Sequence, residues 1–241
     1  MFKTARPVFA KGKEKEMNYQ LLLKASLSSL KDVKLYITAS SFYRLTINGS
    51  FAFFGPARAA IGHARVDVVD LSDYDSKNGD KNNDIIIEVA GYYCKSLATV
   101  RQLSFVQAEL RCGEEVLLAT GENRPDFEAF CNVQRKQKAD RYSMQRHFNE
   151  VWDLRNADIF ADKNKVVLCE VDNSLSYLKS TPNPDFSCVD VDKCASRGSF
   201  VFDETLAYRE NRYSGNQTPE RMIKDDWGAY LNEEVFSRPY P

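Results

Sequence analysis

The sequence predicts an all-β fold, an antiparallel β-sandwich of jelly-roll type, and two observations carry this prediction. The first is an Asn48-Gly49 pair flanked by segments 45–47 and 51–54, which are rich in β-branched and aromatic residues. A type I′ turn needs a positive φ at both central residues, and this pair tolerates it. The second is a series of short apolar segments separated by turn-forming residues, without alternation of strands and helices.

The block from Leu35 to Asp70 is expected to supply the centre of this sandwich. It reads as two strands, the Asn-Gly turn, a third strand, a corner at Gly55-Pro56 and a fourth strand. Residues 19–27 (YQLLLKASL) predict a strand before this block, whereas residues 1–18 are polar and are expected to be irregular.

The strands that follow the block are separated by polar loops. Asp84 to Tyr93 (DIIIEVAGYY) predicts a buried strand, with Gly91 where a bulge or a close backbone approach is expected. The basic segment 134–146 is expected to be a solvated loop. Further strands are predicted at residues 103–112, 116–120, 127–133 and 166–171.

The composition changes near residue 175, which divides the chain into two parts. Residues 1–175 are predicted to form the sandwich, and residues 176–241 a mostly irregular extension that leads to a downstream domain. Within the extension, Thr218 and Pro219 are typical of the N-cap and first position of a short helix.

Net charge, targeting segments and cysteine content limit the partners and the cellular compartment that we expect. Lys and Arg number 33 against 34 Asp and Glu, so no net field attracts nucleic acid or an anionic membrane. No secretory signal and no run of about 18 apolar residues is visible, so a cytoplasmic protein is expected. The six cysteines contain no C-x-x-C pair and are expected to be buried free thiols.

Motifs for catalysis are absent, so we predict no catalytic residue, no cofactor and no metal site. The sequence lacks a phosphate-binding glycine loop, a nucleophile elbow and an H-E-x-x-H motif. Glu150 and Asp153 lie beside aromatic residues and could form a hydrolytic carboxylate pair. The alternative is that such an acid pairs with a neighbouring arginine such as Arg155.

One polar cluster is a candidate carbohydrate-binding site. Arg58 follows the Gly55-Pro56 corner, and His63, Arg65 and Asp67 follow within one predicted strand. Because side chains two residues apart share a face of a strand, these groups can form a patch that contacts sugar hydroxyls. The alternative is an internal Arg–Asp pair that anchors the corner to the sheet. The aromatic residues predicted as a stacking platform are Tyr92, Tyr93 and Trp152.

Several short motifs also occur in the order found in a known group of enzymes. They are Tyr36-Ile37-Thr38-Ala39, the strand and turn Tyr43 to Gly49, the corner Gly55-Pro56-Ala57-Arg58, Arg65-x-Asp67 and Asp70-Leu71. Further matches are the strand Ile85 to Tyr93, Glu150 with Trp152-Asp153-Leu154, and Leu178 with Pro182, Pro184, Asp185 and Phe186. In order and spacing, this set resembles the N-terminal β-sandwich of α-L-rhamnosidase-like glycoside hydrolases.

The resemblance implies a jelly-roll sandwich of galactose-binding-like type that is itself non-catalytic. Members of this family carry their catalytic carboxylates on a separate helical barrel far downstream, so we expect this chain to lack the catalytic part. The implied role is to brace the downstream catalytic domain and to contact a rhamnose-containing glycan. The alternatives are a free-standing carbohydrate-binding module and an independent enzyme that uses a carboxylate pair.

Overall fold

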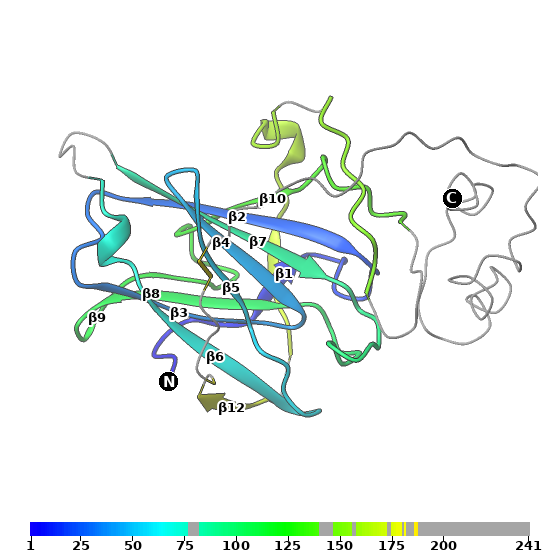
Figure 1. Cartoon of the computed structure of the whole chain (residues 1–241), viewed down its shortest axis with the longest axis horizontal. Helices are drawn as coiled ribbons and strands as arrows, with labels where there is room; N and C mark the ends of the chain where they lie inside the picture. The colour runs from blue at the N-terminus through cyan, green and yellow to red at the C-terminus, as the bar shows by residue number, and fades with distance from the viewer. Residues whose placement is uncertain are drawn as a thin grey trace, which may run out of the picture.

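A computed structural model shows two β-sheets packed face to face (Figure 1). It describes residues 1–76, 82–139, 147–155, 158–172, 175–179, 181 and 186–187. Within this part of the chain the elements are twelve strands and two 3-10 turns, η1 (Ser72–Tyr74) and η2 (Asp162–Asn164). The predicted all-β sandwich is therefore confirmed. The helix expected at Thr218 and most of the extension lie outside the described residues.

The larger sheet has seven strands in the order β11-β1-β8-β3-β6-β12, with β9 paired to β8. Its strands are β1 (Val8–Ala10), β3 (Val33–Ala39), β6 (His63–Asp70), β8 (Val106–Cys112), β9 (Glu115–Ala119), β11 (Leu168–Glu170) and β12 (Ser176–Lys179). All of its pairings are antiparallel except that of β6 with β12, which is parallel.

The smaller sheet has five strands in the order β10-β2-β7-β4-β5, and all of its pairings are antiparallel. Its strands are β2 (Tyr19–Leu27), β4 (Phe42–Ile47), β5 (Ser50–Gly55), β7 (Asn83–Gly91) and β10 (Glu128–Cys131). The chain changes sheet repeatedly between β1 and β8, which is the connectivity expected of a jelly-roll sandwich.

The Asn48-Gly49 turn joins β4 to β5 as predicted. Both residues have positive φ, 51° and 77°, which is the conformation that selects this pair. The Asn48 side chain secures the turn, because its Nδ2 donates to the Tyr74 carbonyl at 3.1 Å and to Asn83 Oδ1 at 2.9 Å. The hairpin is thus held by its own backbone preference and by the next loop.

The core lies between the sheets and follows the alternation of the strands. In the smaller sheet the inward side chains of β4 and β7 are fully buried, and those of β3 and β8 meet them from the larger sheet. They include Tyr43, Leu45, Ile47, Ile85, Ile87, Val89, Leu35, Ile37 and Leu110. Burial of each large apolar side chain contributes about 1.5–3 kcal/mol, so this layer accounts for much of the stability.

Two short strands differ from the sequence prediction. Residues 1–18 were expected to be irregular, but Val8–Ala10 form β1, which is buried between β8 and β11. Residues Ser176–Lys179, assigned to the extension, form β12 beside β6. Both segments have only three or four residues, too few for a strand period to be recognised, and neighbouring strands supply their pairing.

Gly91 and the cysteines refine two other predictions. A Cβ at Gly91 would lie 2.5 Å from Phe9 Cζ, so the expected close approach is confirmed. The four cysteines in the described residues are free thiols, but only Cys94 is buried. Cys112 is exposed because it lies next to the turn of the β8–β9 hairpin, where it pairs with Glu115. Within the described residues, no helix is long and apolar enough to cross a membrane.

Candidate functional site

The outer face of the five-stranded sheet carries the most distinctive group of side chains. Side chains alternate along a strand, so those between the core positions of β2, β4 and β7 point away from the other sheet. One cross-strand row joins Gln20 of β2, Ala90 of β7 and Phe42 of β4. The small Ala90 side chain leaves a depression between its two larger neighbours.

The neighbouring row is charged at its centre. Glu88 of β7 pairs in register with Arg44 of β4, and Arg44 pairs with Phe54 of β5. The Arg44 guanidinium donates to the Glu88 carboxylate across the two strands. Opposite charges at directly facing positions stabilise an antiparallel pair, so this row is also part of what sets the register.

Residues 134–136 and 151–153 pair with each other beside these rows and add further functional groups. Lys136 N donates to the Val151 carbonyl at 2.8 Å and Asp153 N donates to the Gln134 carbonyl at 2.7 Å, which pairs the two stretches. The bridge between Arg135 and Trp152 belongs to the same pairing. This pairing brings Arg135 and the residues before Trp152 onto the sheet face.

Arg135 was predicted to lie in a solvated loop, and this prediction is wrong. Arg135 is only 9% exposed, and its Nη1 atom lies 3.5 Å from Glu88 Oε1 and 3.4 Å from Glu150 Oε1. The Trp152 ring centroid lies 4.9 Å from the Arg135 guanidinium carbon. Two carboxylates and an indole face allow this charge to be buried. Glu88 comes from β7, and Glu150 and Trp152 come from the stretch that pairs with residues 134–136.

Aromatic rings form the opposite wall of the depression. Phe42 stacks on Phe54 with centroids 5.2 Å apart, and Tyr92 stacks on His147 with centroids 4.6 Å apart. The two pairs contact each other, because the Phe42 and His147 rings meet edge to face with centroids 5.2 Å apart. Burial raises the pKa of the Tyr92 hydroxyl to about 12, so this group stays protonated at neutral pH.

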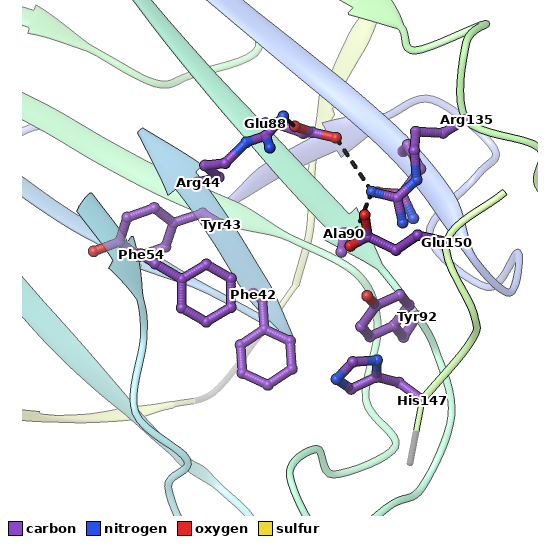
Figure 2. A pocket seen from close by; sticks show the side chains of 11 residues that line it. Phe42, Tyr43, Arg44, Phe54, Glu88, Ala90, Tyr92, Arg135, His147 and Glu150 are labelled. Carbon is purple, nitrogen blue, oxygen red and sulfur yellow. Dashed lines mark hydrogen bonds and ion pairs between the residues drawn. The ribbon is translucent and has the colours of Figure 1, made fainter. Parts of the chain in front are cut away.

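These groups enclose a hollow of about 100 Å³. Figure 2 shows Phe42 and Phe54 on one side, Tyr92 and His147 on another, and the linked charges of Arg44, Glu88, Arg135 and Glu150 along the third. Aromatic faces beside paired charges suit a ligand that has both apolar C–H surfaces and hydroxyl groups. We refer to this hollow, with its floor at Ala90, as the sheet-face pocket.

The two carboxylates in this pocket are not arranged for glycoside hydrolysis. Hydrolysis needs two carboxyl groups facing each other across a sugar bond. Glu88 and Glu150 instead lie beside the same Nη1 atom of Arg135, and Glu88 also accepts a hydrogen bond from Asn132 Nδ2 at 3.2 Å. The space between the two acids is therefore occupied by a guanidinium.

The predicted cluster at the Gly55-Pro56 corner is only partly brought together. Arg58, His63 and Arg65 line a second hollow of about 20 Å³. Arg65 donates from Nε to the Arg58 carbonyl and from Nη1 to the Lys179 carbonyl, both at 3.2 Å. His63 contacts its neighbouring loop through Nδ1, 3.1 Å from the Ile61 carbonyl.

Asp67, the fourth member of that cluster, points into the sandwich. It is fully buried and accepts a hydrogen bond of 2.6 Å from the Tyr43 hydroxyl of the other sheet. Burial and the adjacent Asp67 carboxylate raise the pKa of Tyr43. A Cβ at Gly55 would lie 2.2 Å from Asp67 Oδ2, so the carboxylate sits against the corner. Asp67 thus joins the two sheets behind the corner.

The predicted aromatic platform is divided between two places. Trp152 is 36% exposed and donates from Nε1 to Glu150 Oε2 at 3.2 Å, so it lies at the edge of the sheet-face pocket. Tyr93 lies elsewhere, with the Arg101 guanidinium carbon 4.9 Å from its ring centroid. Asp153 forms a bidentate pair with Arg155, which lowers the pKa of the carboxyl to about 2. This pairing is the alternative considered for the acids near Trp152.

Comparisons with known proteins agree with this fold. The sequence matches no family model and none of the curated proteins. A GH78 family rhamnosidase of Bacillus sp. GL1 superposes with a TM-score of 0.63 and 20% identity, over 74% of this chain and 20% of that chain. The fold is shared. An α-L-rhamnosidase from Dictyoglumus thermophilum gives a TM-score of 0.51 and 13% identity, over 73% of this chain and 22% of that chain.

These likenesses bear out the resemblance noted in the sequence at the level of the fold. The described sandwich is similar to a region that makes up about a fifth of each rhamnosidase chain.

Within the described residues, no group of three or more His, Cys, Asp or Glu side chains is placed to hold a metal ion.

Sequence reasoning missed most of the sheet-face pocket. It named Tyr92 and Glu150 among the lining residues, but it placed Arg135 in a solvated loop and did not single out Gln20, Phe42, Arg44, Phe54 or Glu88. One signal was present, because Arg44 and Glu88 each interrupt an apolar strand at an outward position. Their pairing depends on the register of β4 against β7, because this register places two residues that are far apart in the chain opposite each other.

Proposed function

We propose that this chain is a non-catalytic β-sandwich module of an α-L-rhamnosidase-like glycoside hydrolase, which braces the catalytic domain and contacts carbohydrate. The proposal joins two observations: the fold similarity to rhamnosidase structures and the aromatic, charge-balanced sheet-face pocket. The second observation carries the carbohydrate-binding part, since a shared fold alone does not establish a function.

The chemistry of the pocket supports binding rather than hydrolysis. Its two carboxylates, Glu88 and Glu150, are ion-pair partners of Arg135. Aromatic rings offer a surface for the apolar face of a sugar, while arginine and glutamine side chains offer hydrogen bonds to hydroxyl groups. Such a site retains a glycan and leaves bond cleavage to another part of the protein.

Two assays on the same preparation test this proposal. Calorimetric titration with methyl α-L-rhamnoside and with rhamnose-containing oligosaccharides is expected to show saturable binding. Incubation with an aryl α-L-rhamnoside is expected to release no phenol above background. Turnover of that substrate by the 241-residue chain, or a lack of binding across the sugar panel, would contradict the proposal.

A further inference from the structure

Two of the residues that line the sheet-face pocket each carry a buried polar atom without a hydrogen-bond partner. These atoms are Oε1 of Gln20 and Nη2 of Arg135, and no described residue bonds to either atom. Gln20 is 3% exposed and Arg135 9% exposed, so neither group is compensated by bulk water. An unsatisfied buried donor or acceptor is unfavourable, so a ligand that satisfies both groups would gain affinity from doing so.

The orientation of the Gln20 amide follows from its neighbours. Nδ2 of Asn18 donates to the backbone carbonyl of Gln137 at 2.7 Å, so the side-chain amide oxygen of Asn18, Oδ1, is an acceptor. Nε2 of Gln20 then donates to that Oδ1 atom at 3.0 Å. Because a backbone carbonyl can only accept, this chain of bonds fixes Gln20 Oε1 as the unused acceptor.

Arg135 presents the complementary group. Its guanidinium faces the carboxylates of Glu88 and Glu150 through Nη1 and also interacts with the Tyr92 hydroxyl, whereas Nη2 has no hydrogen-bond partner. The pocket therefore offers one acceptor and one donor. A hydroxyl group both donates and accepts hydrogen bonds, so a polyhydroxylated ligand matches this combination.

The charges lining the pocket select against an ionised ligand. Arg44 and Arg135 are balanced by Glu88 and Glu150, and all four are joined by ion pairs. An anionic group entering beside Glu150 would lose hydration without meeting an unpaired cation. The aromatic pair of Phe42 and Phe54 instead favours an uncharged ring with an apolar face.

We propose that the sheet-face pocket is the binding subsite for one neutral sugar residue. Its hydroxyl groups donate to Gln20 Oε1 and accept from Arg135 Nη2, while its apolar face lies against Phe42 and Phe54. This inference rests on the proposed carbohydrate-binding function and specifies the site and the class of sugar.

Calorimetric titration of four variants with methyl α-L-rhamnoside tests the subsite. Ala90→Leu fills the floor and is expected to abolish binding. Gln20→Met removes the acceptor at similar size and is expected to weaken binding about three- to tenfold, the equivalent of one hydrogen bond. Phe54→Ala is expected to weaken binding about tenfold through loss of stacking. Phe51→Ala is the matched control, because Phe51 lies on the same strand, is similarly exposed and does not line the pocket.

The ligand class is tested by a second titration of the wild-type chain with the methyl glycoside of a uronic acid. This anionic sugar is expected to bind at least about tenfold more weakly than the neutral glycoside, because its carboxylate enters beside Glu150. Equal or tighter binding of the uronide would overturn the neutral-ligand assignment.

Failure of the subsite and failure of the proposed function give different results. If the wild-type chain binds the neutral glycoside but Ala90→Leu and Gln20→Met bind equally well, the subsite is wrong and the function stands. Loss of binding on Arg58→Ala, with Ala90→Leu unaffected, would move the site to the corner. If no sugar binds the wild-type chain, the proposed function itself fails.

Discussion

The outer faces of the two sheets each bury a glutamate beside an arginine, but the chain covers them differently. On the seven-stranded sheet Glu109 lies under the N-terminal segment and accepts hydrogen bonds from Thr4 N at 2.7 Å and Ala5 N at 2.8 Å. Arg111 closes its other side, bonding both Glu109 and the Met1 carbonyl. On the five-stranded sheet, Glu88 lies under Arg135 and itself lines the sheet-face pocket, whereas the hollow of about 790 Å³ beside the N-terminal segment is lined by Gln107 and not by Glu109.

The difference separates a structural polar cluster from a binding site. Around Glu109 the chain's own backbone supplies the donors, and the Tyr36 ring lies 4.1 Å from the Arg111 guanidinium carbon. Around Glu88 the covering segment supplies Arg135, whose Nη2 remains unpartnered. A fully satisfied network holds two segments together, whereas an incompletely satisfied one beside a hollow can be completed by a ligand.

Removal of Glu109 is expected to have the largest effect on stability. Glu109→Ala leaves Arg111 and several backbone amides buried without their acceptor, so the free energy of unfolding should fall by about 3–5 kcal/mol. Glu88→Ala should cost less, since Arg135 keeps Glu150 and Arg44 is half exposed. Urea denaturation of both variants measures the difference.

Glu114→Ala is the control for that comparison. Glu114 is exposed and pairs with Lys3 at the surface, so its removal should change the unfolding free energy by no more than about 0.5 kcal/mol. An equal loss for Glu109→Ala and Glu88→Ala would show that the two faces do not differ in the way described.

Two alanine-to-leucine substitutions compare the close-packed core with the sheet-face pocket. Ala108 is fully buried in the core beside Ile37, so Ala108→Leu should cost about 1–3 kcal/mol through overpacking. Ala90 borders the hollow, so Ala90→Leu should cost less than about 1 kcal/mol. Thermal unfolding of the pair measures this, and equal losses would mean that the sheet-face pocket cannot accept added volume.

The smallest expected effect is a change in pH dependence from Glu109. Burial, the largest single influence, raises the pKa of this carboxyl, but hydrogen bonds from Thr4, Ala5, Lys3 and Arg111 together hold it below the ordinary 4.5. A lowered pKa in the folded state contributes stability that is present above pH 4.5 and is lost as the pH falls through the folded value.

Glu109→Gln removes this titration while keeping the size of the side chain. Its unfolding free energy, measured by denaturation between pH 6 and pH 3, should therefore fall less steeply with acid than that of the wild type. A parallel pH profile for the two proteins would contradict the account of Glu109 as a satisfied anion.

Local patterns in the sequence predict much of the sandwich. The Asn48-Gly49 hairpin follows from the conformations that two neighbouring residues tolerate, and Gly91 marks a close approach because only glycine fits there. Strand β7 follows from its run of β-branched residues. The short strands β1 and β12 escape prediction because their neighbours, rather than their own sequence, make them strands.

The site was harder to predict because it depends on pairings between distant segments. Arg135 in a basic, polar segment is typical of a solvated loop, and its burial depends on Glu88, 47 positions earlier, and on Glu150. Of the residues named from the sequence, Tyr92 and Glu150 line the sheet-face pocket and Trp152 lies at its edge, while Asp67 joins the two sheets. Alternation along single strands shows which residues face outward but not which ones meet.

The most direct test of the account is side-chain NMR of the isotopically labelled chain during titration with methyl α-L-rhamnoside. The Gln20 side-chain amide and the Arg135 guanidinium resonances are expected to shift together and to saturate with one binding constant, while Arg111 and the amides around Glu109 stay unchanged. Shifts confined to Arg58 and Arg65, or no shift at any of these positions, would contradict the claim that the sheet-face pocket binds the sugar.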